Sequence, residues 1–99
     1  MKVYEGTRLR EVTVNGRLLS PILSQEIRSH SPDGFNWGYG GSGPAQLALA
    51  ILLDYAGKEV ALRHYQQFKW DFVVNWKDCW KFTGDEIEMW LTSSKKEAL

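Results

Sequence analysis

The feature that most constrains the fold is an apolar run near the middle of the chain. Ala45 and every residue from 47 to 53 are apolar, and this run lies between Pro44 and Gly57. Proline suits the first position of a helix, where its missing N–H loses no bond, and glycine suits the position just after a helix ends. A helix that is apolar on nearly every side must be buried all round. The sequence therefore predicts a central, buried helix from about Pro44 to Gly57.

Two more helices are expected after this one. Apolar residues recur every three or four positions from about Lys58 to Trp76, which is typical of a helix with one buried face. Thr83 and Glu86 have the spacing of a capping box, in which each side chain bonds to the other residue's backbone N–H at the start of a helix. We expect Leu91 to close the apolar face of that third helix. The apolar positions of the second helix are Ala61, Tyr65, Phe68, Phe72 and Trp76.

Short strands are expected before the central helix. Asn15 and Gly16 have the chemistry of a two-residue type I′ turn, in which both residues take a positive φ. The segments Glu11–Val14 and Arg17–Ser20 on either side of this turn should therefore pair as a hairpin. Val3–Gly6 has the composition of a further strand.

The remaining N-terminal segment leaves two alternatives open. Ile22–Ile27 either extends the small sheet or forms a short helix, because Pro21 leaves the boundary undefined. Together the elements predict an α+β fold, with a small N-terminal antiparallel β-hairpin or sheet packed on three helices, the first of them central and buried. The 99 residues fit a single compact domain. We expect that domain over residues 1–91, followed by a frayed tail over residues 92–99.

The longest segment without a clear period runs from Arg28 to Gly43. Loops of more than about 12–15 residues are uncommon in compact domains and are usually functional or disordered. The aromatic residues of this segment argue against disorder. We therefore expect an ordered loop, with Phe35–Trp37 as a brief strand within it.

Three glycines in this loop have the spacing of a known motif. Gly38, Gly40 and Gly43 spell the G-x-G-x-x-G of dinucleotide-binding folds. That motif needs a buried strand before it and a second parallel strand after the helix, and the sequence indicates neither. A Walker loop is excluded as well, because Pro44 stands where its phosphate-binding lysine would lie. The spacing alone therefore assigns neither fold.

The start of the central helix remains a candidate binding site on general grounds. The first N–H groups of a helix have no partner within the helix, and its dipole favours an anion there. Glycines let a ligand approach the backbone closely, and neighbouring aromatic rings can stack on a base. The alternative is a tight turn with a structural role only, in which the rings pack over the helix and a serine caps it. The candidate ligand-binding residues are Trp37, Tyr39, Gly40, Gly41, Ser42, Gly43 and Gln46.

Charge and composition disfavour several other classes of protein. Lysine plus arginine and aspartate plus glutamate number 12 each, so the surplus of positive charge typical of general nucleic-acid binding is absent. The longest apolar run is far shorter than the roughly 20 residues of a membrane-spanning helix. The first ten residues lack the apolar region of a signal peptide. We therefore expect a cytoplasmic protein without a membrane partner.

The residues that carry enzymatic or metal chemistry are scarce. Cys79 is the only cysteine, and the two histidines share no short spacing, so neither a metal site nor a cofactor is expected. The types needed for a nucleophilic triad occur together between Ser29 and Asp33, but adjacent residues on one segment rarely hold the required geometry. We therefore predict no catalytic residues and favour a protein that is not an enzyme, with a hydrolase left open as a third hypothesis.

The run from Trp37 to Gln46, WGYGGSGPAQ, also carries a resemblance. Together with the sequence that follows, over residues 34–91, it is similar to a family of small bacterial and phage proteins described only as a domain of unknown function. That resemblance implies a compact intracellular protein of mobile elements, where small proteins often counter host defence. It implies no activity and no site residues.

These observations lead to two functional hypotheses of different classes. The first is non-enzymatic binding of a small anionic ligand, above all a signalling nucleotide, at the glycine-rich helix start. In a phage this would sequester the nucleotide from host defence, within a homo-oligomer whose interface uses exposed tryptophans. The alternative is a protein-interaction module that inhibits a host defence protein through an aromatic surface.

Overall fold

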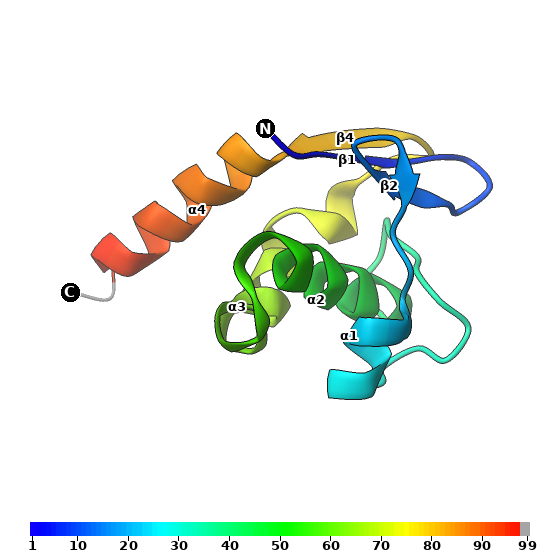
Figure 1. Ribbon diagram of the computed structural model, residues 1–99, viewed down its shortest axis with the longest axis horizontal. Helices are drawn as coiled ribbons and strands as arrows, with labels where there is room; N and C mark the ends of the chain where they lie inside the picture. The colour runs from blue at the N-terminus through cyan, green and yellow to red at the C-terminus, as the bar shows by residue number, and fades with distance from the viewer. Residues whose placement is uncertain (98–99) are drawn as a thin grey trace.

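The computed structural model has an α+β fold, which confirms the predicted class (Figure 1). It describes the backbone of residues 1–97 and the side chains of residues 1–93. A small antiparallel sheet lies over a group of helices, and the last helix extends away from the rest of the molecule. The elements, in chain order, are β1 (Val3–Gly6), β2 (Val12–Val14), β3 (Arg17–Leu18), α1 (Ile22–Ile27), α2 (Ser42–Ala56), α3 (Lys58–Asp71), the 3-10 helix η1 (Val73–Asn75), β4 (Trp80–Thr83) and α4 (Gly84–Glu97).

The sheet has the strand order β3-β2-β1-β4. The predicted hairpin is confirmed: Asn15 and Gly16 have φ values of 50° and 84°, and Val14 lies opposite Arg17. The Ile22–Ile27 segment forms the short helix α1 and does not extend the sheet. Phe35–Trp37 is not a strand, so that prediction was wrong.

The fourth strand was not predicted. β4 lies beside β1, with Tyr4 opposite Phe82 and Gly6 opposite Trp80. Its residues alternate in burial, so that Trp80 and Phe82 face the core while Lys81 is exposed. This alternation spans four residues only, which is too short to distinguish a strand from the helical pattern on either side. β1 and β2 are therefore the two inner strands of the sheet, and each pairs on both sides.

The central helix α2 is buried as the sequence predicts. Every residue from Gly43 to Leu52 is buried, and α3 packs along it, with α1 on another side (Figure 1). The helix begins two positions earlier than expected, at Ser42, so Pro44 lies inside its first turn. Gly57 ends it with a φ of 90°, a left-handed conformation that glycine adopts without strain.

The later helices differ from the prediction in their ends. The second of the expected helices stops at Asp71 and not at Trp76, because Phe72 leaves the helical conformation and η1 follows. The capping box is confirmed: Thr83 N–H donates to Glu86 Oε1 at 3.1 Å, and Glu86 N–H donates to Thr83 Oγ1 at 3.2 Å. The helix it starts continues to Glu97, and residues 98–99 of the expected tail lie outside the described residues.

Candidate functional site

Gln46, one of the expected ligand-binding residues, is buried and fully occupied by the protein itself. Its Oε1 accepts the N–H groups of His30 at 2.7 Å and Ser31 at 3.0 Å. Its Nε2 donates to Ser24 Oγ at 2.9 Å and to the Arg28 carbonyl at 3.2 Å. Gln46 therefore ties the long loop and the end of α1 to the central helix, and it has no exposed polar atom for a ligand.

The three glycines of the helix start lie against side chains of the same chain. A Cβ on Gly40 would lie 2.5 Å from the Trp70 ring, and one on Gly41 would overlap the Tyr39 ring. A Cβ on Gly43 would lie 2.6 Å from Asn36 Cβ. A side chain at any of these positions would force its neighbour to shift, least easily at Gly43, where a backbone atom also lies close, so the glycines have a packing role whether or not a ligand binds nearby.

The other expected ligand-binding residues of the loop differ in their exposure to solvent. Trp37 is 2% exposed, and its indole N–H donates to the Lys77 carbonyl at 2.7 Å. Tyr39 is 48% exposed. Ser42 is exposed within the first turn of α2 and makes no capping hydrogen bond. The structure thus directs Trp37 inward and leaves Tyr39 and Ser42 at the surface.

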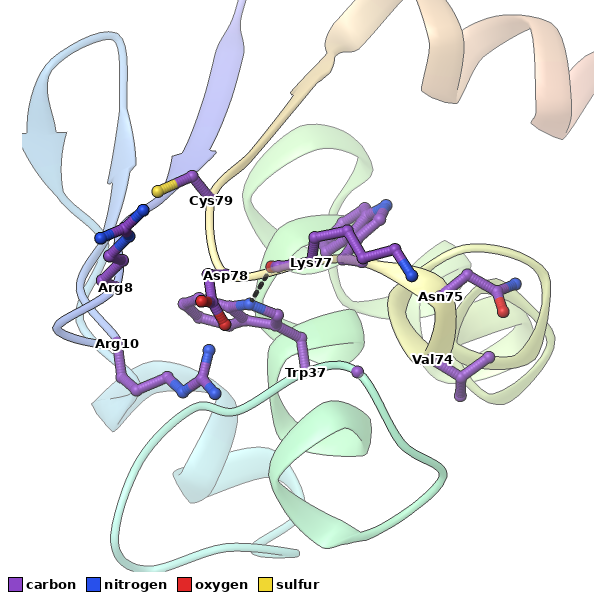
Figure 2. A pocket seen from close by; sticks show the side chains of 10 residues that line it. Arg8, Arg10, Trp37, Val74, Asn75, Lys77, Asp78 and Cys79 are labelled. Carbon is purple, nitrogen blue, oxygen red and sulfur yellow. Dashed lines mark hydrogen bonds between the residues drawn. The ribbon is translucent and has the colours of Figure 1, made fainter.

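Trp37 also lines a cleft, which opens between segments that are far apart in the sequence (Figure 2). It has a volume of about 600 Å³, and its walls are the β1–β2 loop, Trp37 and Gly38, and residues 74–79. Gly38 joins this cleft to the glycine-rich loop, and its N–H donates to the Val73 carbonyl at 3.0 Å. The cleft is therefore adjacent to the predicted site but distinct from the helix start.

The cleft carries more positive than negative charge. Arg8, Arg10 and Lys77 line it, and Asp78 is the single acidic side chain among its lining residues (Figure 2). Among the side chains that the structure describes, the one ion pair within 4.0 Å joins Lys2 and Asp54, on another part of the surface. The three cations of the cleft therefore have no carboxylate within ion-pairing distance in the described part of the chain.

Arg10 is held in a specific position by the β1–β2 loop. Its N–H donates to the Thr7 carbonyl at 2.9 Å, and its φ of 64° is in the left-handed region. This conformation costs a residue other than glycine about 1–2 kcal/mol. The guanidinium lies over the Trp37 ring, with Cζ 4.6 Å from the ring centroid. The strained backbone thus directs Arg10 onto the wall of the cleft.

Stacked tryptophans support the wall behind these charges. Trp76 and Trp80 are stacked, with their centroids 3.9 Å apart, and Trp80 meets Trp37 edge to face at 5.6 Å. The Trp80 indole N–H is buried and has no hydrogen-bond partner among the described residues, because it lies against Gly6. Three tryptophan rings in contact therefore lie behind the charged residues.

Sequence reasoning missed the three cations because none of them belongs to a motif. Arg8 and Arg10 follow β1, and Lys77 precedes β4. The β1–β4 pairing brings the two segments together, and β4 was itself not predicted. The one sequence feature that could have indicated this pairing is Trp80, because its large ring lies against the glycine opposite it in β1.

The groups with acid–base or metal chemistry do not gather in this cleft. His30 is hydrogen-bonded through Nε2 to the Tyr65 hydroxyl at 2.7 Å, away from the cleft lining. Burial lowers the pKa of His30, and the charges of Arg28 and Lys69 lower it further. Within the described residues, no group of three or more His, Cys, Asp and Glu side chains is placed to hold a metal ion.

The fold and the cleft together define a small α+β domain with a cationic, tryptophan-walled cleft. A family model described as "Family of unknown function (DUF6166)" matches residues 4–93, and the chain belongs to that family. The expected membership of a domain-of-unknown-function family is confirmed. No curated protein and no solved structure matches the chain. In the part of the chain that the structure describes, no helix has the length and apolar character needed to cross a membrane.

Proposed function

We propose that the protein binds a small anionic ligand in the cleft lined by Arg8, Arg10 and Lys77, without catalysing a reaction. One observation carries this proposal: three cations without an ion-pair partner among the described residues line a cavity of about 600 Å³. That volume is within the range of about 300–1,000 Å³ typical of small-molecule sites. This site is not the predicted site at the helix start. The two sites share Trp37, and the cleft lies next to the glycine-rich loop.

The charges of the cleft and the fixed position of Arg10 both favour binding of an anion. Like charges that line one cavity repel each other, and an anion between them removes this repulsion. A guanidinium stacked on an indole keeps its N–H groups free at the edge of the stack, where they can bind two oxygens of a phosphate or carboxylate. Because the stack on Trp37 already fixes Arg10, less conformational entropy is lost when the anion binds.

Phosphorylated compounds are the ligand class that we propose, and nucleotides in particular. Phosphate offers several oxygens to the separate donors Arg8, Arg10 and Lys77, which come from two sides of the cleft (Figure 2). Tryptophans line the cleft beside these donors, as they do in sites that bind ring-containing ligands.

Binding of inorganic pyrophosphate tests the site directly. Isothermal titration at low salt should show binding to the unaltered protein, and Arg8→Ala should lower the affinity about 10- to 150-fold, as expected for loss of a charged hydrogen bond worth about 1.5–3 kcal/mol. Arg63→Ala is the matched control, because Arg63 is exposed on α3 and does not line the cleft. Equal losses in both variants, or no binding by the unaltered protein, would contradict the proposal.

Arg10→Gly separates binding from folding. Glycine adopts a φ of 64° without strain, so this change relieves the backbone while it removes the guanidinium. We expect the free energy of unfolding to change by less than about 1 kcal/mol, because strain relief offsets the lost cation–π contact. The affinity for pyrophosphate should fall at least about tenfold. Unchanged affinity would mean that Arg10 serves the loop and not the ligand.

Sequestration of a signalling nucleotide in phage anti-defence is the biological role that we propose, in line with the resemblance to phage proteins. A sequestering protein binds its ligand stoichiometrically and returns it unchanged. Chromatography of a nucleotide released by denaturing the protein after hours of incubation tests this point. A cleaved or modified nucleotide would instead indicate an enzyme.

Inhibition of a host protein through an aromatic surface is the second candidate. The observation in its favour is that Tyr39 and Trp70 are 48% and 55% exposed. The other four tryptophans are buried or partly buried, so an interface built on exposed tryptophans, including one between copies of this chain, would depend on Trp70. A complex that forms with a bacterial protein and is lost in Trp70→Ala, in a protein that binds no pyrophosphate, would favour this candidate.

A further inference from the structure

Two aromatic side chains remain exposed beside the cleft. Tyr39 and Trp70 are the large aromatic residues that the described part of the chain leaves most accessible, at 48% and 55%. Tryptophan is highly buried on average, so an indole more than half exposed is unusual. Both rings lie against the glycine-rich loop, Trp70 over Gly40 and Tyr39 over Gly41. The loop therefore presents two rings at the surface.

Both rings pack against the glycine-rich loop on one side and are open to solvent on the other. A Cβ at Gly40 or Gly41 would displace the ring above it, so the glycines let both rings lie directly on the backbone. On Trp70, the Lys69 ammonium lies 4.3 Å from the ring centroid, a cation–π contact worth about 0.5–1 kcal/mol at exposed sites. These contacts favour one position of each ring, so part of its conformational freedom is already lost before another ring stacks on it.

Tyr39 and Trp70 are both close in sequence to residues that line the cleft. Tyr39 follows Gly38, which lines the cleft, and Trp70 lies just before η1, whose Val74 and Asn75 also line it. The Cα atoms of Gly38 and Gly40 are at most roughly 8 Å apart, because consecutive Cα atoms are separated by about 3.8 Å. The glycine beneath the Trp70 ring is therefore within about 8 Å of a residue that lines the cleft.

We propose that Tyr39 and Trp70 form a stacking surface for the base of a nucleotide whose phosphates occupy the cleft. This inference rests on the proposed binding function and adds the second part of the ligand. Stacking on an aromatic side chain tolerates any base, because every base has a π-face. The ligand class is then a nucleoside phosphate with its base outside the cleft, and the glycine-rich loop shapes the surface that receives the base.

Pyrophosphate and ADP form a matched pair of probes, because they share a diphosphate and differ by an adenosine. In isothermal titrations the unaltered protein should bind ADP about 5- to 150-fold more tightly than pyrophosphate, the range implied by stacking free energies of about 1–3 kcal/mol. Trp70→Ala should remove this difference and leave the affinity for pyrophosphate unchanged. Trp70→Phe should restore part of it.

Controls and outcomes separate this inference from the proposed function. Met89→Ala removes a different exposed apolar side chain, 72% exposed on α4, and should change neither affinity. Pyrophosphate binding with no preference for ADP, or a preference that survives in Trp70→Ala and Tyr39→Ala, would overturn the stacking surface and leave the cationic cleft intact. Failure of both probes to bind would overturn both proposals. Thermal melting of each variant confirms that it is folded.

Discussion

The helix start and the cationic cleft are neighbours, joined at Gly38, yet they differ in how their polar groups are used. At the helix start, Gln46 makes four hydrogen bonds inside the protein, and the glycines lie under side chains. In the cleft, Arg8 and Lys77 face an open volume without an ion-pair partner among the described residues. In the first region the polar groups serve the fold, and in the second region charged groups are available for a ligand.

This difference shows how a motif and a site can lie side by side without coinciding. The residues that form a recognisable pattern, WGYGGSGPAQ, are constrained mainly by packing against one another and against Trp70. The charged residues of the cleft have no local pattern, because chain segments distant in sequence contribute them. The short motif therefore lies next to the candidate site, but the charged residues of the site are brought together only by the tertiary structure.

The largest expected effect on stability comes from removing the hydrogen bonds of Gln46 at the helix start. Gln46→Leu leaves the N–H groups of His30 and Ser31 and the Arg28 carbonyl without their partner at partly buried positions, and an unpaired group costs about 1–3 kcal/mol when it is fully buried. We expect the free energy of unfolding to fall by at least about 3 kcal/mol in urea titrations. Gln66→Leu, at an exposed position of α3, is the control and should change it by less than about 0.5 kcal/mol. A mild effect of Gln46→Leu would reopen a ligand role for this side chain.

An intermediate effect tests the glycines. Gly43→Ala places a methyl group 2.6 Å from Asn36 Cβ and 3.2 Å from its backbone N, inside a buried turn. Overpacking should destabilise the protein by about 1–2 kcal/mol, even after the gain in helix propensity. Gly40→Ala meets the outer edge of the exposed Trp70 ring, which can swing away, so its cost should be smaller. Equal costs in chemical denaturation would show that the Trp70 ring is held more firmly than its exposure indicates.

The smallest expected effect concerns pH and the loop that Gln46 holds. Burial, with the charges of Arg28 and Lys69, lowers the pKa of His30 below its ordinary value of 6.5. The unfolded chain therefore binds more protons than the folded chain just below pH 6.5, so stability should decrease as the pH falls through this range and be fully present above it. Urea midpoints measured from pH 7.5 to 5.5 should fall less in His30→Gln than in the unaltered protein. Identical slopes would contradict the assignment.

Local chemistry explains what the sequence could predict. The Asn15-Gly16 turn, the Thr83–Glu86 capping box and the buried helix α2 are each encoded by residues close together in the chain, and all three are confirmed. The end of α3 was missed because Phe72 and Trp76 continue the apolar period after the backbone has left the helix. The adjacent Val73 and Val74 are β-branched and only weakly unfavourable to a helix, so they gave no clear stop signal.

The cleft could not be predicted because it depends on pairing between distant segments. Of the expected site residues, Trp37 lines it, while Gln46 is used by the fold. Arg8 and Lys77 line one cleft only because β1 lies beside β4, and a four-residue strand carries too little pattern to be recognised alone. Charge counts summed over the chain were balanced and gave no sign of the local excess.

The pairing of β1 with β4 also has a kinetic consequence. β1 ends at residue 6 and β4 begins at residue 80, so closing the sheet requires a long loop, and this closure costs more chain entropy and slows folding more than a local contact does. A chain still emerging from the ribosome has Arg8 and Arg10 but no cleft until Lys77 and β4 have been made. A bound anion would therefore stabilise the closed sheet by mass action, and its presence should slow unfolding.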